Sequence, residues 1–207
     1  MCYFRAMTTS SQLHSNDVRE HILSTGQRIM AGKGFSAVGL NEILTAAGVP
    51  KGSFYHYFAS KEAFGVAMLQ RYFDDYLVEL DHTLSQPGIP MAQRLMNYWQ
   101  QWQDSQSFSD CQGKCLAVKL GAEVADLSDG MRLTLKSGTA GIISRLAQAL
   151  ATGMAEGSLR IDDAPGKTAE SLYQLWLGAS VMVKIVRNTE PFDAAMKTTR
   201  QIIHFSR

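Results

Sequence analysis

Apolar residues recur at helical spacing along most of the chain, and no stretch of useful length alternates apolar and polar residues as a β-strand would. The pattern predicts long helices at residues 17–32, 61–85, 91–103, 114–125, 131–153, 168–187 and 192–205. With 207 residues, 45% of them hydrophobic, the chain is long enough for one large helical body and a small N-terminal head. The predicted fold class is therefore all-α.

Residues 40–64, LNEILTAAGVPKGSFYHYFASKEAF, interrupt this pattern with two short helices. Leu40, Ile43, Leu44 and Ala47 follow one another at spacings of three, one and three, which places one apolar stripe along a short helix. Gly48 can adopt the left-handed backbone that ends a helix. Pro50, two residues later in the chain, suits the first turn of the next helix. The chain is therefore expected to turn sharply between the two helices.

The second short helix, at residues 51–57, is predicted to bury Phe54 and to pack Phe58 beside it, one turn apart. Its other side chains are hydrogen-bond donors with no carboxylate among them, and Ser60 is placed to cap the following helix. Two short helices with a sharp turn and a polar outer face are typical of a helix-turn-helix that binds DNA. An ordinary helical hairpin is the alternative interpretation.

The segment AAGVPKGSFYHYFASKEAF, at residues 46–64, resembles the recognition region of the TetR family of transcriptional repressors. The resemblance implies a DNA-binding domain at residues 16–63, a helical domain for sensing and dimerisation at 64–207, and a disordered or start-site tail at 1–15. Val38 and Gly39 stand where family members often have Thr or Ser, and Pro50 stands where a Ser often caps the recognition helix. These departures put single capping contacts in doubt, but not the fold.

The resemblance also implies how DNA would be held. Base edges are expected to be contacted by Lys51, Gly52, Ser53 and His56, and backbone phosphates by Lys51, Tyr55, Tyr57 and Lys61. His56 could instead bond a phosphate. Residues 172–186 are apolar nearly all round and include the small residues at 178–180, which predicts burial on more than one side. A central core helix of a monomer is one interpretation; the resemblance favours the other, in which the last two helices pair with those of a second copy. The expected partners are a homodimer and a palindromic double-stranded DNA operator.

The distribution of charge along the chain adds modest support for DNA binding by the N-terminal head. The net charge is +1, but residues 1–72 contain seven Lys and Arg against four Asp and Glu, which leaves +3 there and −2 in the remainder. A basic head on an acidic body suits a protein that touches phosphates with one end. No run of 18 apolar residues and no signal-peptide layout is present, so we expect a cytoplasmic protein. Three cysteines argue against a disulfide framework and against a zinc site, and no metal or other cofactor is expected.

Cys115 is the candidate sensing residue. It lies at the predicted start of a helix between Lys114 and, one turn on, Lys119, and both a helix N-terminus and a cation favour thiolate over thiol. Cys111 is close enough along the chain to act as a resolving thiol. A small, inert, buried Cys115 is the alternative. Residues 115–128 and 172–191 resemble a member of the family that responds to reactive electrophiles, which favours release of DNA by oxidation or alkylation of Cys115.

Lys184 is the only charged residue between Glu170 and Arg187, in a helix too apolar to hold an ammonium without a partner. We expect it to share one sensing site with Cys115; pairing with Glu123 or Asp126 is the alternative. A repressor released by a small apolar ligand is the second function considered. Its pocket would be lined by aromatic residues, which could equally be core: Tyr98, Trp99, Trp102, Phe108, Tyr173 and Trp176. An enzyme is not expected, because no histidine sits in a recognisable catalytic motif and no phosphate loop is present.

Overall fold

The computed structural model describes residues 10–105 and 115–205, with side chains from residue 17 onward. Within these ranges the chain is helical apart from turns and one small ribbon, which confirms the all-α prediction. The helices are α1 (Ser10–Lys33), α2 (Leu40–Ala47), α3 (Lys51–Tyr57), α4 (Lys61–Leu84), α5 (Met91–Ser105), α6 (Leu116–Leu127), α7 (Asp129–Ala155), α8 (Pro165–Val186) and α9 (Glu190–Ile202). None of the described helices is both long and apolar enough to cross a membrane.

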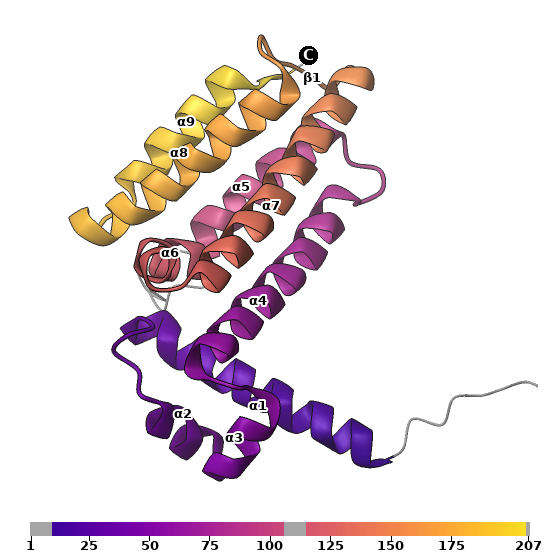
Figure 1. The fold of residues 1–207 in the computed structure, drawn as a ribbon. Helices are drawn as coiled ribbons and strands as arrows, with labels where there is room; N and C mark the ends of the chain where they lie inside the picture. The colour runs from indigo at the N-terminus through magenta and orange to yellow at the C-terminus, as the bar shows by residue number, and fades with distance from the viewer. Residues whose placement is uncertain (1–9, 106–114, 206–207) are drawn as a thin grey trace, which may run out of the picture.

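The molecule consists of a small head, formed by α1 to α3, and a body formed by α5 to α9, with α4 running from one into the other (Figure 1). The predicted boundary after residue 63 therefore falls within the first turn of α4. α1 begins at Ser10, seven residues before the predicted start at residue 17. No glycine or proline between Ser10 and Asp17 would stop a helix.

The head is held together by apolar side chains from all of its helices, seated against the start of α4. Its core includes Ile22, Leu23, Met30, Ile43, Leu44, Phe54, Phe58 and Phe64. α1 approaches α4 closely at Gly26, where a Cβ atom would lie only 2.4 Å from Cζ of Phe64. Only glycine therefore lets α1 pack this tightly over the aromatic ring, and the head is fixed firmly to α4.

In the body, α7 packs against both α4 and α8, and α8 packs against α9 (Figure 1). At Gly138 of α7 an added Cβ would lie 2.1 Å from the Phe73 ring of α4, so these two helices also depend on a glycine for their close approach. The last predicted helix ends at Ile202 rather than Phe205. His204–Phe205 instead forms β2, which pairs antiparallel with β1 (Leu159–Arg160). The extended backbone of Ile203, whose side chain is fully buried, directs the chain into this ribbon.

Candidate functional site

The helix-turn-helix predicted from the sequence is present in the head. Gly48 ends α2 with φ +64° and ψ 28°, and Val49 N–H donates to the Leu44 carbonyl at 3.1 Å across the turn. Pro50 follows in extended backbone and begins α3, while the Ser60 hydroxyl caps α4 by accepting from Ala63 N–H at 3.0 Å. Neither Gly39 nor Pro50 gives a side-chain cap, so backbone geometry alone defines the starts of α2 and α3.

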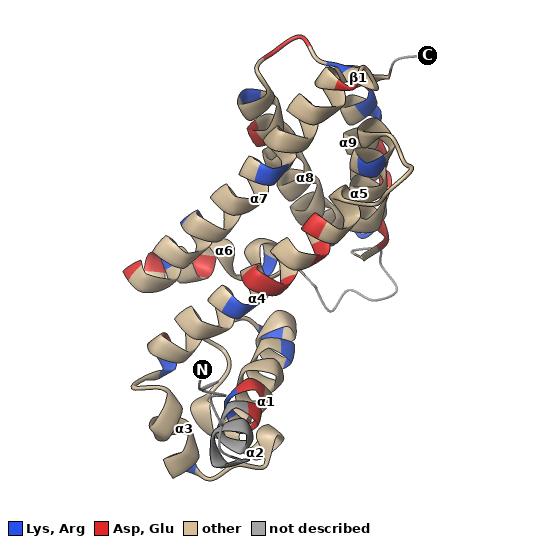
Figure 2. Cartoon of the chain, turned by 90° about the vertical axis from the view of Figure 1, so that its right-hand side faces the viewer, with Lys and Arg blue, Asp and Glu red and all other residues tan. Residues whose placement is uncertain are grey.

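α3 divides into a buried and an open side. Phe54 is 0% exposed and Phe58, at its end, is 3% exposed, as predicted. The open side carries no carboxylate, and its residues are exposed or half-exposed: Lys51, Gly52, Ser53, Tyr55, His56 and Tyr57 (Figure 2). Nothing lies within 4 Å of a Cβ built at Gly52, so a neighbouring molecule could approach the backbone there. The head thus presents a polar surface without negative charge on a helix of the length that fits the major groove.

Lys61, predicted to meet a phosphate, is engaged within the protein in this unbound structure. Its ammonium donates to the Phe35 carbonyl at 2.7 Å and lies 4.5 Å from the centre of the Phe35 ring. Burial lowers the pKa of Lys61, and the nearby Glu123 carboxylate opposes that shift. The ammonium has further N–H groups that a phosphate could accept from beside the Phe35 carbonyl.

Glu123 of α6 joins the body to the head. Its carboxylate accepts from the backbone N–H groups of Phe35 at 3.0 Å and Ser36 at 2.7 Å, in the turn between α1 and α2. Burial acts to raise the pKa of Glu123, but the hydrogen bonds from Ser36 and Phe35 and the charge of Lys61 leave it lowered. We call these four residues, Glu123, Phe35, Ser36 and Lys61, the clasp.

Cys115 immediately precedes the first residue of α6, so it lies at the start of a helix as predicted, and it is 7% exposed. Its thiol is hydrogen-bonded with the phenol of Tyr72, and the backbone amides of Ala117 and Val118 also face it. Burial raises the pKa of the thiol, and these hydrogen bonds and the charge of Lys184 offset the rise only in part. The expectation of a lowered pKa is wrong, because desolvation of the thiolate outweighs the helix terminus and the cation. The charge of Lys184 is the last of the influences that lower the pKa of Cys115, and a shared sensing site of the two residues stays a prediction.

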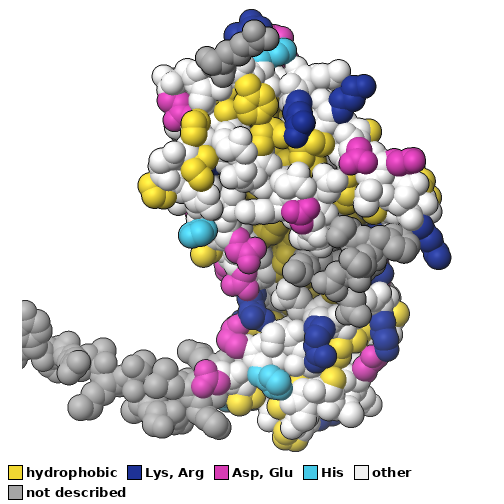
Figure 3. Space-filling view, turned by 180° about the vertical axis from the view of Figure 1, so that it is seen from behind, with side chains coloured by type: hydrophobic (Ala, Val, Ile, Leu, Met, Phe, Trp, Pro, Cys, Tyr) yellow, Lys and Arg dark blue, Asp and Glu magenta, His cyan; other side chains and the backbone are white. Residues whose placement is uncertain are grey.

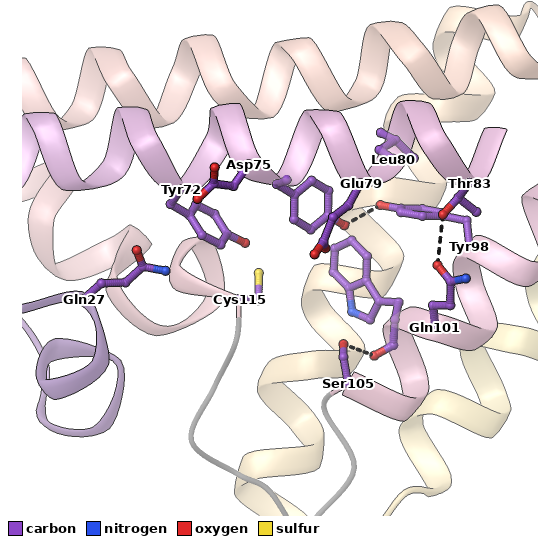
Figure 4. Close-up of a pocket in the computed structure, with 12 residues that line it drawn as sticks. Gln27, Tyr72, Asp75, Glu79, Leu80, Thr83, Tyr98, Gln101, Ser105 and Cys115 are labelled. Carbon is purple, nitrogen blue, oxygen red and sulfur yellow. Dashed lines mark hydrogen bonds between the residues drawn. The ribbon is translucent and has the colours of Figure 1, made fainter. Parts of the chain in front are cut away.

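A cavity of about 410 Å³ opens beside Cys115, between α1, α4, α5 and the start of α6 (Figure 4). Among the described residues it is lined by Gln27, Tyr72, Asp75, Tyr76, Glu79, Leu80, Thr83, Tyr98, Gln101, Trp102, Ser105 and Cys115. The phenols of Tyr76 and Tyr98 share a hydrogen bond of 2.8 Å, and Thr83 donates to Gln101 at 3.1 Å. The cavity thus combines aromatic walls, polar groups and one thiol.

The aromatic residues predicted to line a ligand pocket fall into two groups. Tyr98 and Trp102 line the cavity. Trp99 and Trp176 instead stack with ring centres 5.0 Å apart in the core, and Tyr173 packs edge-on against Trp102 at 5.8 Å. These three are core residues, because stacking among α5, α8 and α9 buries them more completely than a pocket wall would. Phe108, Cys111 and Lys114 lie outside the described residues.

The contribution of α4 to the cavity was not predicted from the sequence. Half of the cavity lining comes from this helix: Tyr72, Asp75, Tyr76, Glu79, Leu80 and Thr83. Their spacings of three, one, three, one and three place them on one face. One feature of the sequence could have indicated this role. A single face of the helix mixes tyrosines and carboxylates, whereas its other faces are apolar or fully exposed.

The body also carries an open apolar strip at the C-terminal end of α8. Val181, Met182, Ile185 and Val186 are all exposed, Ile185 to 66%. Gly178, one turn earlier, has nothing within 4 Å of a built Cβ. Apolar side chains are also open to solvent elsewhere on the body, where they lie among charged ones (Figure 3). On α8 the exposed apolar side chains are contiguous. Such a continuous apolar surface is typical of a site that binds another protein.

Comparison with known proteins matches both halves of the chain to families of regulators. Residues 22–68 match the model described as "Bacterial regulatory proteins, tetR family", and residues 91–199 match "Tetracyclin repressor-like, C-terminal domain". The HTH-type transcriptional repressor NemR of Escherichia coli strain K12 is 43% identical over 188 residues, which are 91% of this chain and 94% of that protein. The HTH-type transcriptional repressor DhaR of Mycobacterium sp. strain GP1 is 36% identical, over 85% of this chain and 87% of its own length.

A solved structure extends the similarity to three dimensions. The crystal structure of the reduced form of E. coli NemR aligns with a TM-score of 0.87 at 44% sequence identity. The alignment covers 92% of this chain and 98% of that one. The head, the long connecting helix and the helical body are therefore arranged alike in the two proteins.

Proposed function

The chain belongs to the TetR family of bacterial transcriptional regulators, and from this premise we propose that it is a dimeric repressor released from DNA when Cys115 is oxidised or alkylated. One observation carries the proposal: Cys115 lines a cavity at the start of the same short helix whose Glu123 holds the DNA-binding head. A chemical change at the thiol can therefore alter the position of the head. The names of the similar NemR and DhaR proteins favour repression over activation.

DNA is held by α3. Its open side offers an ammonium, hydroxyls and an imidazole, which can donate to base edges and phosphates, and it repels no phosphate. Lys51 and Tyr55 lie together, with the ammonium 5.8 Å from the ring centre, so one cation and one phenol mark the same part of the interface. We assign base contacts to Lys51, Ser53 and His56, with close backbone approach at Gly52. Tyr55, Tyr57 and Lys61 contact phosphates.

Two copies pair through α8 and α9. The exposed strip of Val181, Met182 and Ile185 gives the apolar surface, and Gly178 lets a partner helix approach closely. Two heads on a twofold axis then contact two half-sites of a palindromic operator.

The signal passes along α6. Glu123 follows Cys115 by eight residues, or roughly 12 Å of helix. A group attached to the thiol breaks the hydrogen bond with Tyr72, adds volume in a close-packed region and changes the contact with Lys184. α6 must shift to accommodate the added group. The shift moves the Glu123 carboxylate away from the backbone N–H groups of Phe35 and Ser36 and weakens the clasp. The head then turns away from the geometry that two half-sites require.

The test uses a DNA duplex selected by the protein from a random-sequence pool, with binding followed by fluorescence anisotropy. A parent variant with Cys2→Ser and Cys111→Ser leaves Cys115 as the single thiol. N-ethylmaleimide should lower the affinity of this parent about a hundredfold, the upper range of allosteric coupling. The same protein with Cys115→Ser added should keep its affinity. Equal responses of the two proteins would refute the assignment of Cys115.

A non-covalent effector is the second candidate, favoured by the volume of the cavity and by its aromatic walls, Tyr98 and Trp102. N-ethylsuccinimide has the shape of N-ethylmaleimide but no electrophilic double bond. If release were caused by occupancy alone, both compounds would release DNA, and Cys115→Ser would respond as its parent does. We expect only the maleimide to act.

A further inference from the structure

We propose that Asp75 and Glu79 make the Cys115 cavity select small electrophiles that carry no negative charge, so that neutral and cationic molecules reach the thiol and anionic ones are repelled. The inference rests on the proposed function in taking Cys115 as the reacting group. It adds the class of molecule that the site accepts.

The two carboxylates lie one helical turn apart on α4, on the face that also presents Tyr72 and Tyr76 to the cavity (Figure 4). Among the described lining residues they are the charged ones, and both are negative. Both are exposed, so they stand where a molecule arriving from solvent would first meet the cavity, whereas Cys115 is buried. Figure 3 shows acidic side chains gathered on one flank at the junction of body and head.

Nearby cations neutralise this charge only in part. Arg71 Nε lies 3.8 Å from Asp75, but it is closer, at 2.9 Å, to Glu20. Within the described part of the chain, no cation lies within 4.0 Å of the Glu79 carboxylate. Residues 106–114, which precede Cys115 in the chain, contain one Asp and one Lys and so add no net charge. The described part of the lining is therefore negative.

Other groups in the lining are neutral hydrogen-bonding groups, and one of them, the Tyr72 phenol, interacts with the thiol itself. Burial raises the pKa of Tyr72 and of Tyr98, so both phenols stay protonated at neutral pH. A protonated phenol can donate to the carbonyl oxygen of an α,β-unsaturated carbonyl compound. In the reaction the sulfur forms a bond to the β-carbon, the carbon–carbon π bond is broken, and the thiol proton ends on the α-carbon. No group leaves, and no oxidant is needed.

The test measures how fast charged and neutral reagents of similar size modify Cys115 in the single-thiol parent. The reagents are 2-aminoethyl, 2-hydroxyethyl and 2-sulfonatoethyl methanethiosulfonate, which carry positive, zero and negative charge. Each forms a mixed disulfide with the thiol and releases methanesulfinate, while the thiol proton passes to solvent. Rates come from intact-protein mass spectrometry and are divided by the rate of the same reagent with 2-mercaptoethanol, which removes intrinsic differences in reactivity.

We expect the normalised rate of the cationic reagent to exceed that of the anionic one by about tenfold at low salt, with the neutral reagent between them, and the ratio to fall at high salt. Asp75→Asn and Glu79→Gln should each lower the ratio by about threefold, and the double variant should bring it near one. Asp74→Asn is the matched control. Asp74 is an exposed neighbour on α4 that accepts from Gln70 at 2.9 Å and is not among the cavity-lining residues, so this change should leave the ratio unaltered.

A ratio near one in the parent, or a ratio that the single and double variants leave unchanged, would overturn charge selection. The DNA-binding assay on the same modified samples separates this result from the proposed function. Selective modification without release of DNA would refute the proposed function and leave charge selection standing. Unselective modification that releases DNA would do the reverse, and failure of all three reagents to modify Cys115 would refute both.

Discussion

At the scale of single residues, Cys115 is subject to opposing influences. The start of α6, the Tyr72 phenol and the charge of Lys184 all favour the thiolate, yet burial disfavours it more strongly. The thiol is therefore held mostly protonated at neutral pH, with partners in place that stabilise the thiolate once it forms. Such a residue should be slow towards weak electrophiles and should respond to those strong enough to react with a small thiolate fraction.

Tyr72→Phe tests this balance. Removing the phenol removes a hydrogen bond that lowers the pKa of Cys115, so the pKa should rise further from its ordinary value. In the single-thiol parent, the rate with N-ethylmaleimide at pH 7 should fall about two- to tenfold, as for one hydrogen bond of roughly 0.5–1.5 kcal/mol. The midpoint of the pH–rate profile should move upward. A midpoint that stays in place would show that Tyr72 does not stabilise the thiolate.

Features that depend on the local backbone preference of single residues, or on helical spacing, could be predicted from the sequence. Gly48 and Pro50 defined the turn, and Phe54 and Phe58 defined the buried side of α3, because backbone preference and helical spacing are local properties. Prediction from sequence failed for the pKa of Cys115, since burial is decided by helices distant in the chain. The cavity was missed for the same reason: Gln27, Tyr72 and Gln101 meet only in the folded protein.

At the scale of elements, α6 is short but contacts both functional parts of the molecule. Its 12 residues begin after the cavity thiol and carry Glu123 to the turn between α1 and α2. Gly34 in that turn has φ +94°, and a Cβ there would lie 3.0 Å from the Glu123 carboxylate. Glycine thus satisfies both the backbone conformation and the space that the clasp requires. The sequence could not indicate this contact, because the residues it joins are 87 and 88 positions apart.

Glu123→Gln should loosen the clasp. The carboxylate has a lowered pKa in the folded protein, so its stabilising effect is present above the ordinary value of 4.5 and is lost as the pH falls through the folded value below it. At pH 7 the variant should lose about 1 kcal/mol of unfolding free energy, a modest value because the group is partly exposed to solvent. In urea denaturation, the difference from wild type should shrink below pH 4.5. A difference that does not depend on pH would contradict this role.

At the scale of the whole molecule, the exposed strip on α8 is the surface through which we propose that two copies pair. Ile185→Glu places a charge at its centre and should convert the dimer to a monomer in analytical ultracentrifugation. Binding to a palindromic duplex should weaken at least about a hundredfold, because the second head no longer binds as part of the same molecule. Val78→Glu is the control, since Val78 is equally open, at 70% exposure, but lies on α4. An Ile185→Glu protein that remains dimeric would place the interface elsewhere.

The uninterrupted course of α4 has a geometric consequence for the dimer. One end of this 24-residue helix holds Phe64 in the core of the head, and its second half forms a wall of the cavity. The middle of the cavity wall lies roughly 20 Å along the helix from Phe64, so a tilt of only about 5° there would carry the head sideways by about 2 Å. In a twofold dimer, the parts of the two displacements that lie across the symmetry axis point in opposite directions. The separation of the recognition helices can therefore change by up to about twice that distance. A group of only a few carbon atoms on Cys115 can thus change the separation of the recognition helices on which simultaneous binding of two half-sites depends.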